Sequence, residues 1–171
     1  VVWYDTPLAK GESTSERKIG NSFVNMPEVD CIVDLLIRTQ FVLGTRAKKV
    51  RAVTIGVISG YNEQVETLRR EIGRRTELSG MDIECNSVHT FQGREVDICI
   101  YSVTRNNTKG DIGFLDDWRH LNVALSRARW HLVIVGSWQF CASIRGENPF
   151  AEVLKFAASD SDCDVKWCAD A

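Results

Sequence analysis

The sequence lacks several features that would assign the chain to a class at once. It has no run of about 18 apolar residues, the length that a membrane-spanning helix needs, so we expect no membrane span and no membrane partner. It also lacks an excess of one charge, because 21 Lys and Arg stand against 23 Asp and Glu, for a formal net charge of −2. No global basic signature of nucleic-acid binding is present, although a local patch would be enough for such binding.

The sequence also lacks a CxxC pair, although it has six cysteines. Cys31 and Cys99 fall inside apolar patterns, which favours free buried thiols in a reducing compartment. We therefore expect an intracellular protein, nuclear or cytoplasmic. The alternative for Cys163 and Cys168 is half of a zinc site, but no second Cys or His pair lies nearby, so we expect no metal.

Strand and helix patterns alternate along the chain. Strands are expected at 2–5, 50–59, 81–88, 96–103 and 130–135, and helices at 26–42, 65–73, 115–128, from 138 and at 150–158. Nearly continuous apolar strands separated by helices predict an α/β fold, a three-layer sandwich with a mostly parallel sheet. With 44% hydrophobic residues, the chain suffices for one domain at 1–158, followed by an acidic tail at 159–171 with a candidate last strand at 165–167.

Two polar blocks each lead into an apolar strand. Residues 86–97 read Asn-Ser-Val-His-Thr-Phe-Gln-Gly-Arg-Glu-Val-Asp, and residues 119–129 read Arg-His-Leu-Asn-Val-Ala-Leu-Ser-Arg-Ala-Arg. Ligands of such sheets meet the loops beyond the carboxyl ends of the strands, and we expect both blocks there. Taken alone, Gln92-Gly93 also fits an ordinary turn, and Arg127 and Arg129 also fit charges that favour a helix C-terminus.

The two blocks resemble motifs V and VI of superfamily 1 helicases, in the DNA2/NAM7-like branch that includes the nonsense-mediated-decay helicase and senataxin. Upstream, residues 22–25 followed by Glu28 resemble the segment that opens the first helix of the second RecA-like lobe. Residues 58–64 are similar to the (Ser/Thr)-Pro-Tyr-x-x-Gln stretch of the family, with glycine in place of proline. Ser126 stands where threonine is usual, and His120 stands where a second arginine is common. The resemblance covers about residues 1–140.

The resemblance implies the C-terminal RecA-like motor lobe of an ATP-dependent RNA or DNA helicase or translocase. It implies that Arg127 is the arginine finger, which stabilises charge on the transferring phosphoryl group. It places the backbone of Gly93 near the γ-phosphate and Glu95 at the ribose hydroxyls. Gln92 would link the nucleotide to the nucleic-acid track, and we count it with Arg127 as catalytic.

The resemblance also implies a track for one nucleic-acid strand across the lobe. Thr90 and Arg105 are candidates for contacts with the strand backbone. Tyr61 and His89 are further candidates, because an aromatic ring on a loop can stack on a base. The alternatives are a core position for Tyr61 and for Trp118, and a loop-capping role for His89.

The chain has no GxxxxGK[ST] loop and no strand that ends in an acidic pair. NTP hydrolysis needs both a phosphate-binding loop and a group that holds magnesium. By the resemblance, ATP and Mg²⁺ are bound mainly by the N-terminal RecA-like lobe, which this chain lacks. The expected partners are that lobe of the same protein and single-stranded RNA or DNA, and the chain alone is expected to be inactive.

A non-catalytic RecA-like module that binds nucleic acid or serves as a scaffold is the alternative. Gln92, Glu95 and Arg127 argue against it, because a scaffold has no physical need for that set. A free-standing α/β hydrolase would need a nucleophile elbow or a paired acid and base, and the sequence has neither.

Overall fold

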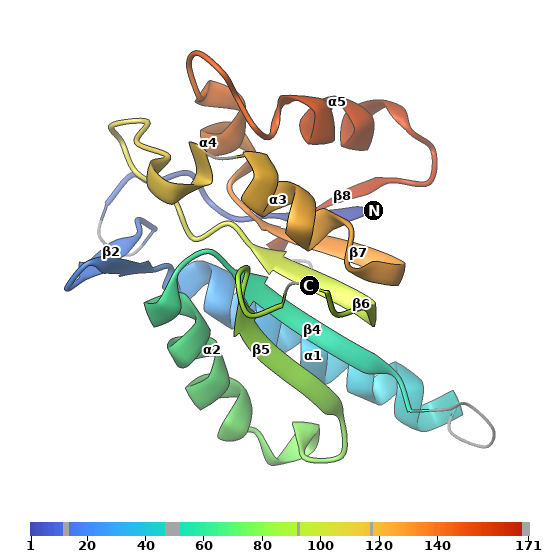
Figure 1. Ribbon diagram of the computed structural model, residues 1–171. Helices are drawn as coiled ribbons and strands as arrows, with labels where there is room; N and C mark the ends of the chain where they lie inside the picture. The colour runs from blue at the N-terminus through green and yellow to red at the C-terminus, as the bar shows by residue number, and fades with distance from the viewer. Residues whose placement is uncertain (12–13, 47–51, 92, 117, 169–171) are drawn as a thin grey trace.

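A six-stranded parallel sheet lies at the centre of the computed structural model, which describes residues 1–171 except 12–13, 47–51, 92, 117 and 169–171 (Figure 1). The strand order is β5-β4-β6-β7-β1-β8, and each neighbouring pair is parallel. The strands are β1 (Val2–Asp5), β4 (Thr54–Ser59), β5 (Asp82–Ser87), β6 (Val96–Ser102), β7 (Ala128–Gly136) and β8 (Asp164–Trp167). The predicted α/β fold with a mostly parallel sheet is confirmed.

Helices cover both faces of this sheet (Figure 1). The helices α1 (Met26–Arg46) and α2 (Asn62–Gly73) pack on one face, where Ile32, Leu36 and Leu68 are fully buried. The helices α3 (Trp118–Leu125), α4 (Trp138–Ser143) and α5 (Ala151–Ser159) pack on the other face with Trp3 and Phe150. Successive strand residues point to opposite faces, which divides the core into two clusters and produces the predicted three layers.

A small antiparallel hairpin and two 3-10 turns complete the elements of the described residues. The hairpin joins β2 (Arg17–Ile19) to β3 (Ser22–Val24), and its Gly20 has φ = 56°, a left-handed conformation that glycine adopts without strain. The turns are η1 (Thr76–Leu78) and η2 (Gly113–Asp116), and η2 leads directly into the region of α3. Within the described chain, no helix is both long enough and apolar enough to cross a membrane.

The end of the chain joins the central sheet. The strand β8 pairs with β1 in the register Val2↔Asp164 to Asp5↔Trp167, so the candidate last strand is present. Cys168 follows this strand and forms a disulfide with Cys31 of α1, with 5.7 Å between the two Cα atoms. The expectation that all six cysteines are free is wrong for this pair, because the sheet brings together residues that are 137 positions apart. Cys85, Cys99, Cys141 and Cys163 form no disulfide.

Candidate functional site

The predicted site residues lie at two opposite edges of the sheet. Arg105 follows β6 and Tyr61 follows β4, so both lie at the carboxyl edge, as expected. Gly93 and Glu95 precede β6, and Arg127 precedes β7, so these three lie at the amino edge. The predicted position at the carboxyl ends therefore holds for His89 and Thr90, which follow β5, and is wrong for Gly93, Glu95 and Arg127. A connection between parallel strands runs from the end of one to the start of the next, and residues late in it reach the amino edge.

The loop that crosses the sheet from β5 to β6 is fixed by Phe91. Its ring is fully buried against Gly56 in β4, where a Cβ atom would lie 2.5 Å from Phe91 Cζ. Before Phe91, the hydroxyls of Thr90 and Ser87 are 3.0 Å apart, and Thr90 is exposed near the carboxyl end of β5 together with His89. After Phe91, Gly93 has φ = 82°. The loop therefore places Thr90 and Gly93 on either side of a buried anchor, and Gln92 lies outside the described residues.

The two polar blocks meet at the amino edge, where Arg94 and Arg127 are in contact although they lie 33 positions apart in the sequence. The Val96 amide donates to the Arg127 carbonyl at 3.0 Å, which joins the starts of β6 and β7. Arg127 Nη1 donates to the Arg94 carbonyl at 3.4 Å, and its Nε donates to the Val123 carbonyl at 2.9 Å. Tertiary pairing thus brings the end of motif V beside the end of motif VI.

The two arginines of the second block differ in their partners. Arg129 Nε donates to a Glu95 carboxylate oxygen at 3.2 Å, and its Nη1 lies 3.8 Å from the buried carboxylate of Asp97. Arg127 instead donates to neutral oxygens among the described residues, namely two carbonyls and, at 2.8 Å, the Ser126 hydroxyl. Arg129 is therefore paired within the lobe, whereas the partly exposed charge of Arg127 is suited to an incoming anion.

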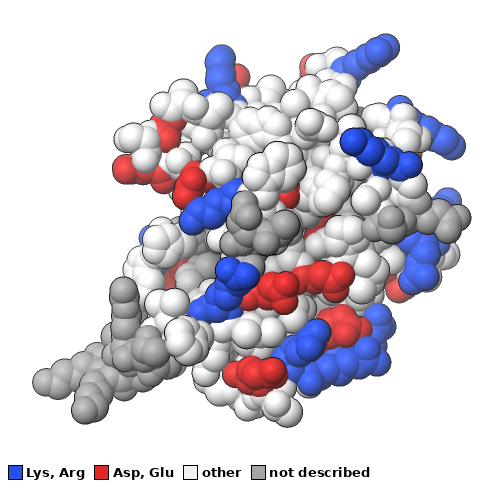
Figure 2. Space-filling model, turned by 180° about the vertical axis from the view of Figure 1, so that it is seen from behind, with Lys and Arg blue, Asp and Glu red and all other residues white. Residues whose placement is uncertain are grey.

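A hollow of about 210 Å³ lies beside this arginine pair, lined by residues at the starts of β4, β5 and β6. Glu95 and Arg94 line it, and Arg94 also pairs with Glu84. Charges on the face seen in Figure 2 are mixed, with basic and acidic side chains side by side. That face therefore carries no patch of a single charge, consistent with the net charge of −2.

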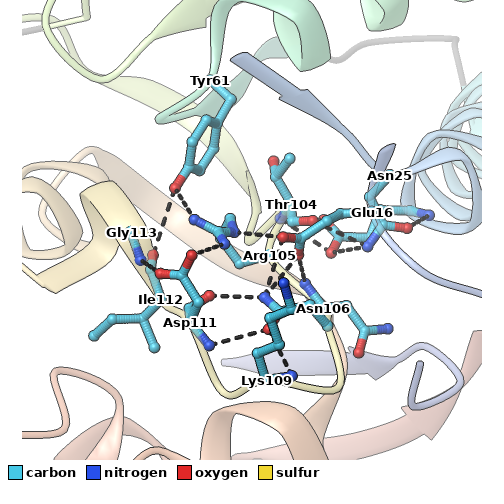
Figure 3. A network of polar contacts seen from close by, with 12 residues as sticks. Glu16, Asn25, Tyr61, Thr104, Arg105, Asn106, Lys109, Asp111, Ile112 and Gly113 are labelled. Atoms are coloured by element: carbon cyan, nitrogen blue, oxygen red, sulfur yellow. Dashed lines mark hydrogen bonds and ion pairs between the residues drawn. The ribbon is translucent and has the colours of Figure 1, made fainter. Parts of the chain in front are cut away.

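At the carboxyl edge, Arg105 is the centre of a buried network (Figure 3). Its Nε donates to Glu16 at 2.9 Å, its Nη2 lies 3.0 Å from Asp111, and its Nη1 donates to the Tyr61 hydroxyl at 3.3 Å. The guanidinium carbon lies 4.2 Å from the centre of the Phe23 ring. Arg105 is 2% exposed and Tyr61 is 6% exposed. Their predicted contacts with nucleic acid stay predictions, and both side chains are internal in this arrangement.

Asn106 ties the following loop to the N-terminal segment, a role that the sequence analysis missed. Its side-chain oxygen accepts from the Ala9 amide at 3.0 Å, and its side-chain nitrogen donates to the carbonyls of Pro7 and Thr14 at 2.7 and 3.0 Å. Its backbone amide donates to Glu16. The only signal in the sequence is the run Thr-Arg-Asn-Asn directly after an apolar strand, since its partners lie about 90 residues away.

Glu28, in the first turn of α1, fixes the turn that leads to Arg105. Its side chain is fully buried and accepts from the Thr104 amide at 2.8 Å, the Ser102 hydroxyl at 2.6 Å and the Asn25 amide group at 3.1 Å. Thr104 has φ = 70°, a left-handed conformation that a β-branched residue rarely adopts. Burial raises the pKa of Glu28 from its usual 4.5 to about 8, although the hydrogen bonds oppose this change.

This shift predicts that the lobe loses stability as the pH rises. Below about pH 4.5 the carboxyl is protonated in both states, and between 4.5 and 8 only the unfolded chain ionises, which favours unfolding. We expect the urea midpoint of the wild-type chain to fall from about pH 5 to about pH 8 and then to level off. Glu28→Gln, which is neutral throughout, should flatten this dependence. An equal slope in the two proteins would show that Glu28 is not the group responsible.

Two candidates at the start of α3 stay predictions. The side chains of Trp118 and His120 lie outside the described part of the structure, so neither the core position predicted for Trp118 nor the role of His120 is tested. No group of three or more His, Cys, Asp or Glu side chains among the described residues is arranged to hold a metal ion. The half zinc site at Cys163 and Cys168 is contradicted by the disulfide of Cys168.

Comparison with known proteins identifies the family of this lobe. Residues 1–139 match the model of a family described as AAA domain. The chain is 39% identical over 138 residues to DNA polymerase alpha-associated DNA helicase A of Saccharomyces cerevisiae, covering 80% of this chain and 19% of that protein. It is 39% identical over 176 residues to the DNA replication ATP-dependent helicase/nuclease dna2 of Schizosaccharomyces pombe, covering 98% of this chain and 11% of that protein.

A human relative shows the same relation at lower identity. The chain is 30% identical over 159 residues to the probable helicase senataxin, covering 92% of this chain and 6% of that protein. The chain thus spans less than a fifth of each of these relatives. The matched residues include both polar blocks and every strand of the central sheet except β8. The chain belongs to the AAA-domain family and is a RecA-like lobe of a superfamily 1 helicase of the DNA2/NAM7-like branch.

Proposed function

We propose that this chain is the C-terminal motor lobe of an ATP-dependent RNA or DNA helicase, with Arg127 as its arginine finger. The observation that carries the proposal is the difference between the partners of Arg127 and those of Arg129 at the amino edge. Arg129 is neutralised by Glu95 and Asp97, whereas Arg127 contacts neutral oxygens and keeps its charge for a phosphoryl group. Family membership supplies the class of reaction.

The amino edge would face the N-terminal lobe, which holds ATP and Mg²⁺. Gly93, with its left-handed backbone, would approach the γ-phosphate closely, because no side chain stands in the way. Glu95 would reach the ribose only by releasing Arg129, to which it is bonded in this arrangement. Closing of the two lobes around ATP and opening after hydrolysis would then change their grip on the strand.

The carboxyl edge would carry the strand track. His89 and Thr90 are exposed there, and Arg105 and Tyr61 lie beneath the surface of the same edge. Phe91, buried between Thr90 and Gly93, would connect strand contacts to nucleotide contacts through one loop. The alternative of a non-catalytic scaffold explains neither the difference between the two arginines nor the exposed pair at 89–90.

We expect the 171-residue chain alone to show no magnesium-dependent ATP turnover. The sequence has no phosphate-binding loop, so it lacks the groups that hold the triphosphate and metal. The same chain preceded by a first RecA-like lobe should hydrolyse ATP, and single-stranded nucleic acid should stimulate it. Steady-state phosphate release measures both. Robust turnover by the lone chain would contradict the half-site proposal, and no turnover by the two-lobe protein would contradict the motor role.

A further inference from the structure

An open hollow of about 430 Å³ lies over the Arg105 network at the carboxyl edge. Three cations line it, namely Arg105, Lys18 and Lys109, and two carboxylates, Glu16 and Asp111, face them. Phe23, whose ring lies under the Arg105 guanidinium, adds an aromatic surface. A hollow that combines cations with an aromatic ring has the chemistry that binds one nucleic-acid strand.

The two carboxylates hold Arg105 in different ways. The Glu16 side chain is 6% exposed and accepts from Arg105, from the Asn106 amide and from the Asn107 side chain. The Asp111 side chain is 62% exposed and lies 3.0 Å from Arg105 Nη2, at the boundary with solvent. Glu16 is therefore a fixed counterion, whereas Asp111 is a replaceable anion on the solvent side.

The loop that carries Asp111 is built to lie against the guanidinium. A Cβ atom at Gly113 would collide with Arg105 Nη1, so glycine permits this close approach. The Asp111 amide donates to the Asn107 side chain at 3.0 Å, and the Gly113 amide donates to the Asp111 carboxylate at 2.9 Å. Residues 108–111 are exposed. Rotating the Asp111 side chain aside would break its contacts with Arg105 and with the Gly113 amide, and would open Nη2 of Arg105 to the hollow.

We propose that this hollow binds a backbone phosphate of a single nucleic-acid strand, and that Asp111 occupies the phosphate position on Arg105 until the strand displaces it. This inference rests on the proposed strand-binding function. In the resting arrangement the three cations face two carboxylates, and displacement of Asp111 leaves a single carboxylate against them. The exchange of one anion for another on Arg105 explains how a residue that is 2% exposed can contact a nucleic-acid strand.

The test compares Asp111→Asn with wild type in the two-lobe protein, using labelled oligo(dT) and oligo(U). Asparagine keeps an oxygen for the Gly113 amide but does not compete for Arg105 as an anion. The variant should bind the strand about two- to fivefold more tightly, the range set by an exposed ion pair. Asp162→Asn is the matched control, because Asp162 is an exposed aspartate in the loop before β8 and the change in charge is the same. It should change affinity much less.

Hydrogen exchange of the loop gives a second, independent readout. Strand binding to the wild-type protein should speed exchange of the Gly113 amide, because its acceptor leaves. Exchange that is unchanged or slowed, together with equal affinities for Asp111→Asn and Asp162→Asn, would overturn this inference while leaving strand binding intact. If no strand binds to any of the proteins, the proposed function fails as well. Equal acceleration by inorganic phosphate alone would overturn the assignment to a strand.

Discussion

Arg127→Ala in a two-lobe protein should reduce ATP turnover by about 10³-fold or more, the usual effect of losing an arginine finger. The guanidinium matters most in the transition state, when negative charge spreads over the phosphoryl oxygens. Strand binding without nucleotide should stay nearly intact, because Arg127 lies at the amino edge and the proposed track lies at the carboxyl edge. Arg127→Lys should rescue poorly, since an ammonium group cannot reproduce the planar fork. Steady-state ATPase and strand-binding measurements on the same preparations test these expectations.

Arg129→Ala is the matched control for Arg127. It removes the same type of side chain from the same block, but Arg129 is paired with Glu95 and Asp97. We therefore expect lower stability and a far smaller loss of turnover than for Arg127→Ala. If Arg127 only favoured the end of a helix, its replacement would cost about 1 kcal/mol of stability at most and would spare turnover. A folded Arg127→Ala protein with near-normal ATPase would contradict the motor assignment.

Arg105→Ala should lower the free energy of unfolding by about 3–5 kcal/mol, the cost of breaking a buried ion pair. The reason is Glu16, whose side chain is 6% exposed and would lose its cationic partner inside the lobe. The Tyr61 hydroxyl would lose a donor as well. Urea unfolding of the 171-residue chain, followed by circular dichroism, measures the change.

Arg74→Ala is the control for this measurement. Arg74 pairs with Glu71 at 2.8 Å, but its side chain is 65% exposed, so water screens the pair. We expect a loss of about 1 kcal/mol or less. Glu16→Gln added to Arg105→Ala should recover part of the stability, because a neutral amide needs no counterion. A loss below about 1 kcal/mol for Arg105→Ala alone would show that the network is not a buried ion pair in solution.

The fold class could be read from the sequence because its signals are local. Apolar runs such as 98–101 and helical spacing such as that of Val65, Leu68 and Ile72 reflect burial of single elements. The two polar blocks could also be recognised from the sequence, because each is contiguous and leads into a strand. Such patterns indicate which face an element buries. For a parallel sheet, this information nearly suffices to predict the helix–sheet–helix layers.

The site could be predicted only in part, because its geometry depends on contacts between distant segments. The resemblance singled out Arg127, but only the structure shows that Arg129, two positions later, is paired with Glu95 and Asp97. It named Arg105 as a strand contact, and the structure buries that side chain between Glu16 and Tyr61. A motif fixes which residue is present, whereas the partners that neutralise it come from elsewhere in the chain.

The alternation of strands and helices, the family motifs and the lack of a phosphate-binding loop follow from the amino-acid sequence alone. The edge of the sheet that each motif occupies, the burial of Glu28, and the pairing of Cys31 with Cys168 become known only from the folded chain. The physical reason is the range of the interactions. Periodic burial and motif chemistry depend on residues that are close in the sequence. Desolvation, ion pairing and disulfides depend on segments that only folding brings together.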